Sequence, residues 1–226
     1  MSGVKYTIDY YQREYKWQAK NITELLEDLA DKFRDSYDPA HDRNQVENYG
    51  TYFLGSIVIS KKNGKNFIID GQQRLTSLTL LLIYLNNLQK TRPEIAGVDI
   101  DPLVFSEKYG RKSFNLDIPE RIACMDALYA GKTYDVENGA SESLRNVVAR
   151  YQDIVENFPD DLKEAARPYF IDWLLDNVYL VEITAYSDED AYIIFETMND
   201  RGLSLSPTDM LKGYLLSNII DDQKRV

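Results

Sequence analysis

The residues of this chain best suited to chemistry lie in one short segment, residues 66–77. A strand pattern ends there in Asp70-Gly71, and a helical pattern begins with two amides and an arginine, Gln72-Gln73-Arg74. The first N–H groups of a helix have no partner within the helix, and the helix dipole favours negative charge beside them. A glycine before the helix allows positive φ and the close approach of a ligand to the backbone. The segment therefore predicts an anion site.

Arg74 falls in the first turn of this helix, where a cation is unfavourable for the helix dipole. We therefore expect its guanidinium group to face an anion. Two anions suit this position: the phosphate of a ligand, and the carboxylate of a neighbouring acidic residue beside a capped turn. These residues by themselves leave both interpretations open.

The length and composition favour one globular domain without a membrane span. The chain has 226 residues and is 44% hydrophobic, enough for one sizeable core. Its longest apolar stretch, residues 78–85, is too short to cross a bilayer, and the N-terminus lacks the apolar core of a signal peptide. We expect a soluble, cytoplasmic protein. Cys124, the single cysteine, excludes an internal disulfide and a thiolate metal cluster.

The net charge of −11, from 26 basic and 37 acidic residues, opposes tight binding to duplex DNA, which depends on phosphate neutralisation. A nucleotide in a local basic pocket is easier to reconcile with this charge. Residues 5–20 offer such a pocket, because basic residues there alternate with aromatic ones such as Tyr15 and Trp17. These rings could stack on a base or lie half-buried at a basic edge.

The hydrophobic pattern predicts an α+β fold. Residues 4–8 read as a strand, and residues 21–24 have capping-box spacing ahead of an amphipathic helix. Strands over residues 52–59 and 67–69 should form a hairpin through Asn63-Gly64. A buried helix should follow the second of these strands, and residues 178–183 read as another strand. We expect a small mixed sheet flanked by helices.

Helical periodicity dominates between the two halves of this expected core. The pattern predicts helices over residues 119–130, 141–157 and 159–176. We therefore expect a single domain with its core at about residues 1–90 and 178–226 and a helical insertion at about residues 103–177. Two further helices are expected after capping residues at 187–190 and 206–209.

Three motifs occur in a characteristic order. They are Tyr11-Gln-Arg-Glu-Tyr-Lys-Trp17, then residues 53–56 leading to Asp70-Gly-Gln-Gln-Arg-Leu-Thr76, and then residues 195–202 with 205–209. Over residues 11–216 the chain resembles the GmrSD restriction endonuclease N-terminal domain family. The resemblance implies a fold like that of ParB and sulfiredoxin, in which a Gly-x-x-Arg turn holds nucleotide phosphates. It also implies nucleoside-triphosphate-dependent restriction of modified DNA, a type IV-like phage defence.

The same resemblance has limits. Sulfiredoxin chemistry needs a cysteine inside the Gly-x-x-Arg turn, where this chain has Gln72 and Gln73. An HNH-type nuclease needs more than His41, the one histidine. We therefore expect no nuclease activity in this chain alone. The resemblance implies a C-terminal HNH-like nuclease domain or a separate nuclease subunit as partner, with modified DNA bound through the full-length protein.

Phosphoryl transfer depends on charge neutralisation and an oriented water, so arginines, backbone amides, a metal-binding carboxylate and polar side chains suffice. The predicted catalytic residues are Asp70, Gln72, Gln73 and Arg74. The predicted contacts to a nucleoside triphosphate are Gln12, Arg13, Tyr15, Trp17, Gly71, Arg74, Thr76, Asn199 and Arg201. The predicted ligands of Mg²⁺ are Asp70, Glu196 and Asp200.

Each assignment has a structural alternative. Asp70 could only cap the helix, Glu196 could only pair with Arg74, and residues 199–202 could be only a tight turn. An alternative function for the whole domain is a non-hydrolysing sensor that binds nucleotide or DNA and regulates an attached nuclease.

Overall fold

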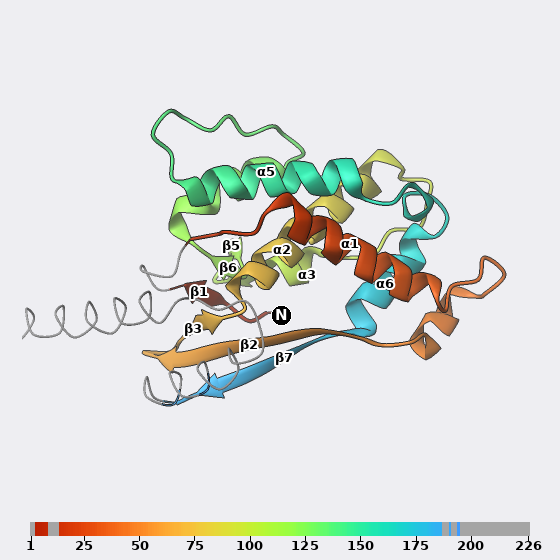
Figure 1. Ribbon diagram of the computed structural model, residues 1–226, viewed down its shortest axis with the longest axis horizontal. Coiled ribbons are helices and arrows are strands. Elements are labelled where there is room, and N and C mark those ends of the chain that lie inside the picture. Colours follow the sequence, from red (N-terminus) through yellow and green to blue (C-terminus); the bar gives the residue numbers. More distant parts are fainter. Residues whose placement is uncertain (1–2, 9–13, 187–189, 191–193, 195–226) are drawn as a thin grey trace, which may run out of the picture.

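The computed structural model describes residues 3–8, 14–186, 190 and 194 (Figure 1). A five-stranded mixed sheet has the order β6-β1-β3-β2-β7. Strand β1 runs parallel to β3 and β6, whereas β2 is antiparallel to β3 and parallel to β7. The predicted α+β class is confirmed. The strands are β1 (Tyr6–Ile8), β2 (Tyr52–Lys62), β3 (Lys65–Asp70), β6 (Leu116–Asp117) and β7 (Val178–Ala185).

The helices lie together on one side of this sheet, with α5 farthest from β2 and β7 in Figure 1. Helix α2 is buried at nearly every position of its first three turns, because the sheet and the other helices surround it. The α-helices are α1 (Ala19–Arg34), α2 (Gln72–Thr91), α3 (Asp101–Val104), α4 (Ile122–Tyr129), α5 (Glu142–Asn157) and α6 (Arg167–Asp176). The 3₁₀ turns are η2 (Arg43–Asn48), η3 (Pro119–Arg121) and η4 (Asp160–Leu162).

Two hairpins organise the strands. The predicted β2–β3 hairpin is present, and its turn residues Asn63 and Gly64 both have positive φ, at 50° and 71°. A second hairpin, formed by β4 (Phe105–Lys108) and β5 (Arg111–Phe114), was not predicted. Its turn has Tyr109 at φ 54°, a conformation rare for a bulky residue, so Gly110 (φ 73°) was the only usual turn residue there.

Several predicted boundaries differ from the structure. The first part of the expected helical insertion contains β4, β5 and β6, and β6 joins the main sheet beside β1. Helix α1 begins at Ala19 rather than after residue 21, because the Asn21 side chain accepts a hydrogen bond from the Gln18 N–H (3.0 Å). The predicted helix over residues 141–157 is present as α5, with Ser141 as its N-cap residue. The helices expected after residues 187 and 206 lie outside the described residues.

An aromatic cluster forms the centre of the helical core. The Phe33 ring lies 5.4 Å from the Phe170 ring and 5.8 Å from the Trp173 ring, measured between centroids. The Trp173 indole N–H donates to the Gly50 carbonyl (2.7 Å). These contacts join α1 and α6 to the loop that precedes β2.

This packing predicts a large difference between two Phe→Ala variants. Phe33 is 0% exposed and Phe53 is 64% exposed. Phe33→Ala should lower the free energy of unfolding by about 3–5 kcal/mol through lost burial and a cavity. Phe53→Ala, the matched control, should change it by about 0.5 kcal/mol or less. Urea unfolding followed by circular dichroism measures both, and equal losses would contradict the assigned core.

Candidate functional site

Gly71 brings the first turn of α2 against strand β2. It is the N-cap residue of α2 and has φ 87°, in the left-handed region. A Cβ atom at this position would lie 2.6 Å from the Ile57 Cγ2 atom and 2.9 Å from the Ser56 carbonyl oxygen. No other residue type fits both the conformation and the space. The glycine expected from the sequence is therefore required by the contact between α2 and β2.

Arg74 lies against the same part of β2. Its Nη1 donates to the Ser56 carbonyl (2.7 Å), and a Cβ atom on Gly55 would lie 3.2 Å from the Arg74 Cζ atom. Among the described residues no carboxylate lies within ion-pair distance of this half-buried guanidinium group. A guanidinium group has five N–H donors, so donors remain beyond the one bonded to Ser56. The positively charged guanidinium group of Arg74 therefore lies beside the N-terminus of α2.

Asp70 is the last residue of β3 and is half-buried. It does not cap α2, because Gly71 is the N-cap residue and no side chain bonds to the cap. Within the described ranges Asp70 makes no side-chain hydrogen bond or ion pair, and no group of three potential metal-ligating side chains occurs there. The carboxylate is therefore available beside the helix N-terminus as a single ligand.

The Gln73 side chain holds the segment that precedes α1. Its Oε1 accepts hydrogen bonds from the N–H groups of Lys16 (2.9 Å) and Trp17 (3.3 Å), and its Nε2 donates to the Glu14 carbonyl (2.9 Å). Both ends of the amide are thus engaged by backbone groups. This geometry opposes the predicted role of Gln73 in orienting a water molecule.

Gln72 points into a buried environment. The residue is 7% exposed, and its Oε1 has no hydrogen-bond partner. An unpaired buried amide oxygen costs free energy, typically about 1–3 kcal/mol. The burial leaves little room for the water-orienting role that was predicted for Gln72.

Tyr15 belongs to the core. Its ring is 1% exposed, and its hydroxyl group lies 2.7 Å from the Ser77 Oγ atom. Burial raises the pKa of this hydroxyl to about 12. Trp17 is half-buried and packs against the same core. The position of the Tyr15 ring corrects the predicted stacking of a base on it, because no face of that ring reaches the surface.

A buried arginine that the sequence analysis missed lies beside Thr76. Arg121, the last residue of η3, is 2% exposed and donates to the Thr76 Oγ1 (3.3 Å) and the Ser143 Oγ (2.9 Å). Its Cζ lies 5.8 Å from the centroid of the Tyr15 ring, within cation–π range. Thr76 is itself buried, so the structure places it under the site and not at the surface predicted to contact nucleotide.

One face of α5 holds residues 15–17 from the other side. The Ser143 Oγ accepts from the Tyr15 N–H (3.1 Å), the Asn146 Nδ2 donates to the Tyr15 carbonyl (2.8 Å), and the Arg150 Nη1 donates to the Trp17 carbonyl (3.0 Å). The spacing of these three residues puts them on one helical face. The segment 14–17 is therefore fixed between α2 and α5.

The remaining predicted site residues lie outside the described part of the chain. They are Gln12, Arg13, Glu196, Asn199, Asp200 and Arg201. Of the predicted residues that the structure describes, Asp70, Gly71 and Arg74 meet at one surface, and Tyr15, Gln72, Gln73 and Thr76 pack beneath or beside it. The His41 Nδ1 atom lies 3.0 Å from the Tyr49 hydroxyl, and the His41 carbonyl accepts a hydrogen bond from the Tyr169 hydroxyl of α6 (3.0 Å).

Comparison with known proteins identifies the class of domain to which this strand–helix site belongs. The sequence matches the family described as "GmrSD restriction endonuclease, N-terminal domain" over residues 1–216. Since this match covers nearly the whole chain, the chain belongs to that family. It is also similar to Uncharacterized protein MJ0686 of Methanocaldococcus jannaschii, with 25% identity over 219 residues. That similarity covers 89% of this chain and 37% of the relative, so the chain spans well under half of the relative's length. None of the described helices has the length and apolar character needed to cross a bilayer.

The close contact at Gly71 can be tested with a matched glycine. Gly71→Ala should destabilise the protein in two ways, by about 1–2 kcal/mol for the left-handed conformation and by a further ~1–3 kcal/mol for overpacking against Ile57. Gly64→Ala should show only the first cost, because φ is 71° and no atom lies within 4 Å of its added Cβ. Thermal and urea unfolding measure both, and equal destabilisation would contradict the steric role of Gly71.

The role of Gln73 can be separated from that of Gln72. Gln73→Ala removes the acceptor for the Lys16 and Trp17 amides, so these two amides should exchange hydrogen at least about fivefold faster, equivalent to a loss of roughly 1 kcal/mol. Gln72→Ala removes no hydrogen bond to this segment and should leave both exchange rates unchanged. Amide exchange measured by NMR gives the comparison. Unchanged rates in Gln73→Ala would contradict the role of these hydrogen bonds in holding the segment.

Proposed function

We propose that this domain binds the phosphates of a nucleoside triphosphate at the N-terminus of α2. The observation that carries the proposal is the half-buried Arg74 guanidinium group, fixed on the Ser56 carbonyl (2.7 Å) and without a carboxylate partner among the described residues. Charge-assisted hydrogen bonds from a guanidinium group suit phosphate oxygens. The first N–H groups of α2 are further donors at this end of the helix, where the helix dipole also favours an anion.

Asp70 is the residue that would hold Mg²⁺ in this proposal. Magnesium ions bound with nucleotides take one or two carboxylates from the protein and complete their shell with phosphate oxygens and water. A single available carboxylate directly before Gly71 fits that requirement. The ion would neutralise phosphate charge next to the site.

The described side chains support binding better than hydrolysis. Both ends of the Gln73 amide are bonded to the segment 14–17, and Gln72 is buried. Neither is free to orient an attacking water molecule. We therefore propose nucleotide binding as the primary function and a sensing role toward an attached or separate nuclease as its consequence. Hydrolysis, the alternative, would need groups from outside the described residues.

Membership of this family supports a biological role for the domain in restriction. In that setting the domain would act in nucleotide-dependent restriction of modified DNA, as a defence against phage, together with a nuclease domain or subunit. Phosphate release by the purified protein, measured with ATP and GTP in the presence of Mg²⁺, separates an NTPase from a binding module.

The arginine can be tested directly. Arg74→Ala should weaken binding of a triphosphate by about one to two orders of magnitude, since hydrogen bonds to charged groups contribute roughly 1.5–3 kcal/mol each. Arg145→Ala removes the same charge from an exposed position on α5 and should leave affinity unchanged. Calorimetry with ATP and GTP, with and without Mg²⁺, measures the affinity. A folded Arg74→Ala protein that binds as tightly as wild type would exclude this site.

A further inference from the structure

The two edges of the five-stranded sheet differ in length. Strand β6, at one end of the order β6-β1-β3-β2-β7, has only two residues, whereas β7 at the other end has eight. No described strand pairs with the outer side of β7. Figure 1 shows β7 at the lower boundary of the described part of the chain, on the side away from α5. An edge strand of this length presents a row of backbone N–H and C=O groups to which another strand can bond.

Strand β7 lacks the features that usually protect an exposed edge. Such edges commonly carry lysine or proline, or contain a β-bulge that turns the strand away. The sequence of β7 is Val178-Tyr-Leu-Val-Glu-Ile-Thr-Ala185, without lysine, arginine or proline. The irregular register between β2 and β7 comes from one extra residue on β2, Leu54, so the bulge does not lie in β7 itself. The outer side of β7 is therefore open to pairing.

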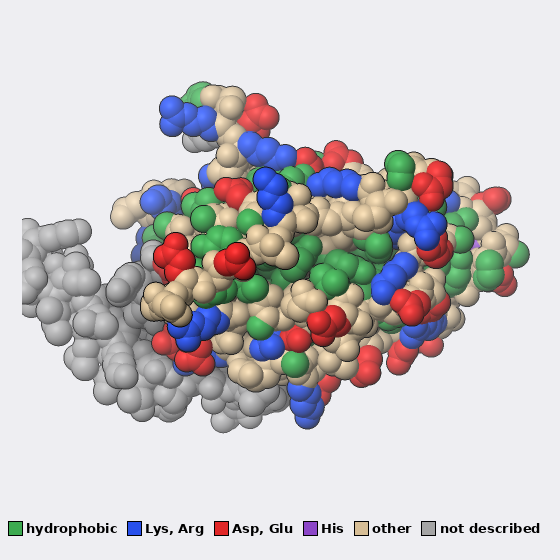
Figure 2. Space-filling view, turned by 90° about the horizontal axis from the view of Figure 1, so that it is seen from above, with side chains coloured by type: hydrophobic (Ala, Val, Ile, Leu, Met, Phe, Trp, Pro, Cys, Tyr) green, Lys and Arg blue, Asp and Glu red, His purple; other side chains and the backbone are tan. Residues whose placement is uncertain are grey.

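Glu182 is the one charged residue of β7, and its carboxylate is bonded within its own chain. Its Oε2 accepts from the Tyr6 hydroxyl (2.6 Å), and its Oε1 accepts from the Thr184 hydroxyl (3.3 Å). Tyr6 belongs to β1, which β3 and β2 separate from β7, so the carboxylate is directed over its own sheet and not across the outer edge. The face over the helices, in contrast, shows many basic and acidic side chains (Figure 2). The edge at β7 thus has little charge to oppose an incoming strand.

Apolar side chains form a row along one face of β7. Tyr179 is 52% exposed and Val181 is 46% exposed. Alternate residues of a strand share one face, so Ile183 continues the same row. Ile183 packs beside the buried residues Val58 and Ala185. The part of the row nearest the start of β7 is therefore apolar and half exposed, which suits contact with a second strand that carries the same pattern.

The pattern of β7 is complementary to itself in the antiparallel direction. When Val181 lies opposite Val181 of a second copy, residues 178–184 of both copies are paired. Tyr179 then lies opposite Ile183 of the second copy, an aromatic and β-branched pair that stabilises a sheet. Leu180 lies opposite Glu182 of the second copy on the other face. Centring the pair on Glu182 would instead set two carboxylates opposite each other, which opposes pairing. The side chains therefore favour a register centred on Val181.

We propose that two copies of this chain associate through β7, which pairs antiparallel with β7 of the second copy about a two-fold axis at Val181 and forms one continuous sheet. On β2 the neighbour of Val181 is Ser56, whose carbonyl accepts the hydrogen bond from Arg74. The Ser56 residues of the two copies are then three strand spacings apart, about 14 Å. The dimer thus brings the two proposed nucleotide sites close together, although the association itself does not depend on nucleotide.

The association is weak and strengthens with salt. Pairing of two edge strands with few side chains is expected to bury less than about 1,200 Å² in total, as transient complexes do. Each copy has a net charge of −11, so two copies repel each other at low ionic strength, and salt screens this repulsion. We expect a Kd on the order of 10 µM at about 0.15 M salt and a lower Kd at higher salt.

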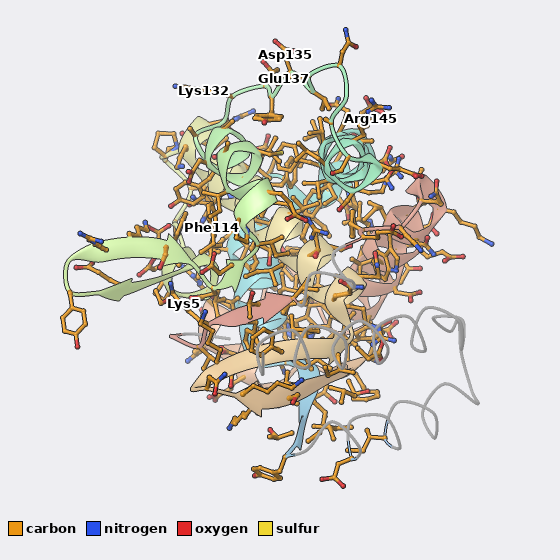
Figure 3. The ribbon with its side chains drawn as sticks, turned by 90° about the vertical axis from the view of Figure 1, so that its left-hand side faces the viewer. Lys5, Phe114, Lys132, Asp135, Glu137 and Arg145 are labelled. Carbon is orange, nitrogen blue, oxygen red and sulfur yellow. The ribbon has the colours of Figure 1, made fainter. Side chains whose placement is uncertain are left out.

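Sedimentation velocity of the purified chain, between about 1 and 200 µM, tests the proposal. Val181→Lys sets two lysines directly opposite each other at the two-fold axis and should raise the Kd at least about 10-fold. Val155→Lys is the matched control, because Val155 is also exposed (36%) but lies on α5. Figure 3 shows Arg145 of the same helix at the opposite end of the molecule from β7. This control should keep the wild-type Kd.

A cysteine variant tests the register and does not depend on the folding of the lysine variant. Directly opposite residues of antiparallel strands have Cα atoms about 4.5–5.5 Å apart, within the range of a disulfide. Val181→Cys should therefore cross-link two copies on mild oxidation. Tyr179→Cys should not, because Ile183 of the second copy lies opposite this position. Cys124, the natural cysteine, is 0% exposed and does not compete.

Three results would overturn the proposal: a wild-type chain that sediments as a monomer throughout this range, equal weakening by both lysine substitutions, and cross-linking of Tyr179→Cys as readily as of Val181→Cys. Hydrogen exchange of the β7 amides identifies the cause of a negative result. A monomer with protected β7 amides would show that other residues of the same chain cover the edge, which also excludes the dimer. Calorimetry with a triphosphate should be the same for Val181→Lys and wild type, so failure of the dimer and failure of the nucleotide site are distinguishable.

Discussion

The arrangement of the whole domain depends on the close approach of helix α2 to strand β2 at Gly71. A side chain there would lie within 2.6 Å of Ile57, so only glycine lets α2 begin in contact with the sheet. From that point α2 runs through the core, and the sheet, α4 and α5 pack around it. The same approach places Arg74 on the Ser56 carbonyl. The packing of α2 on the sheet and the position of Arg74 therefore both depend on the absence of a Cβ atom at residue 71.

Buried polar groups fix what surrounds this contact. Gln73, Arg121 and Ser143 each bond to residues 14–17, to Thr76, or to one another. Buried polar networks of this kind are costly when incomplete, so they specify one arrangement of the chain. Several side chains that resemble catalytic groups in the sequence thus serve to position the site, and Arg74 with Asp70 remains at its surface.

The net charge of the chain does not describe the charge around each site on its surface. A net charge of −11 opposes nucleic-acid binding by the domain as a whole, yet the half-buried Arg74 guanidinium group has no carboxylate partner within the described part of the chain. Electrostatic attraction is screened beyond about 8–10 Å at physiological salt, so nearby charges decide what a surface attracts. A local site for an anion is therefore compatible with a chain whose net charge is negative.

Four features could be predicted from the sequence, because each depends on neighbours a few residues apart: the α+β class, the β2–β3 hairpin, the strand–turn–helix element at Gly71 and the helix over residues 141–157. The β4–β5 hairpin could not, since Tyr109 stands before Gly110 where a strong hairpin signal has asparagine or aspartate, and the pairing of β6 with β1 joins residues more than one hundred positions apart. The roles of Gln73, Tyr15 and Arg121 were likewise decided only by tertiary structure. Residue type and spacing determine which groups are able to bind a phosphate, whereas burial and long-range hydrogen bonds determine which of those groups are left free to do so.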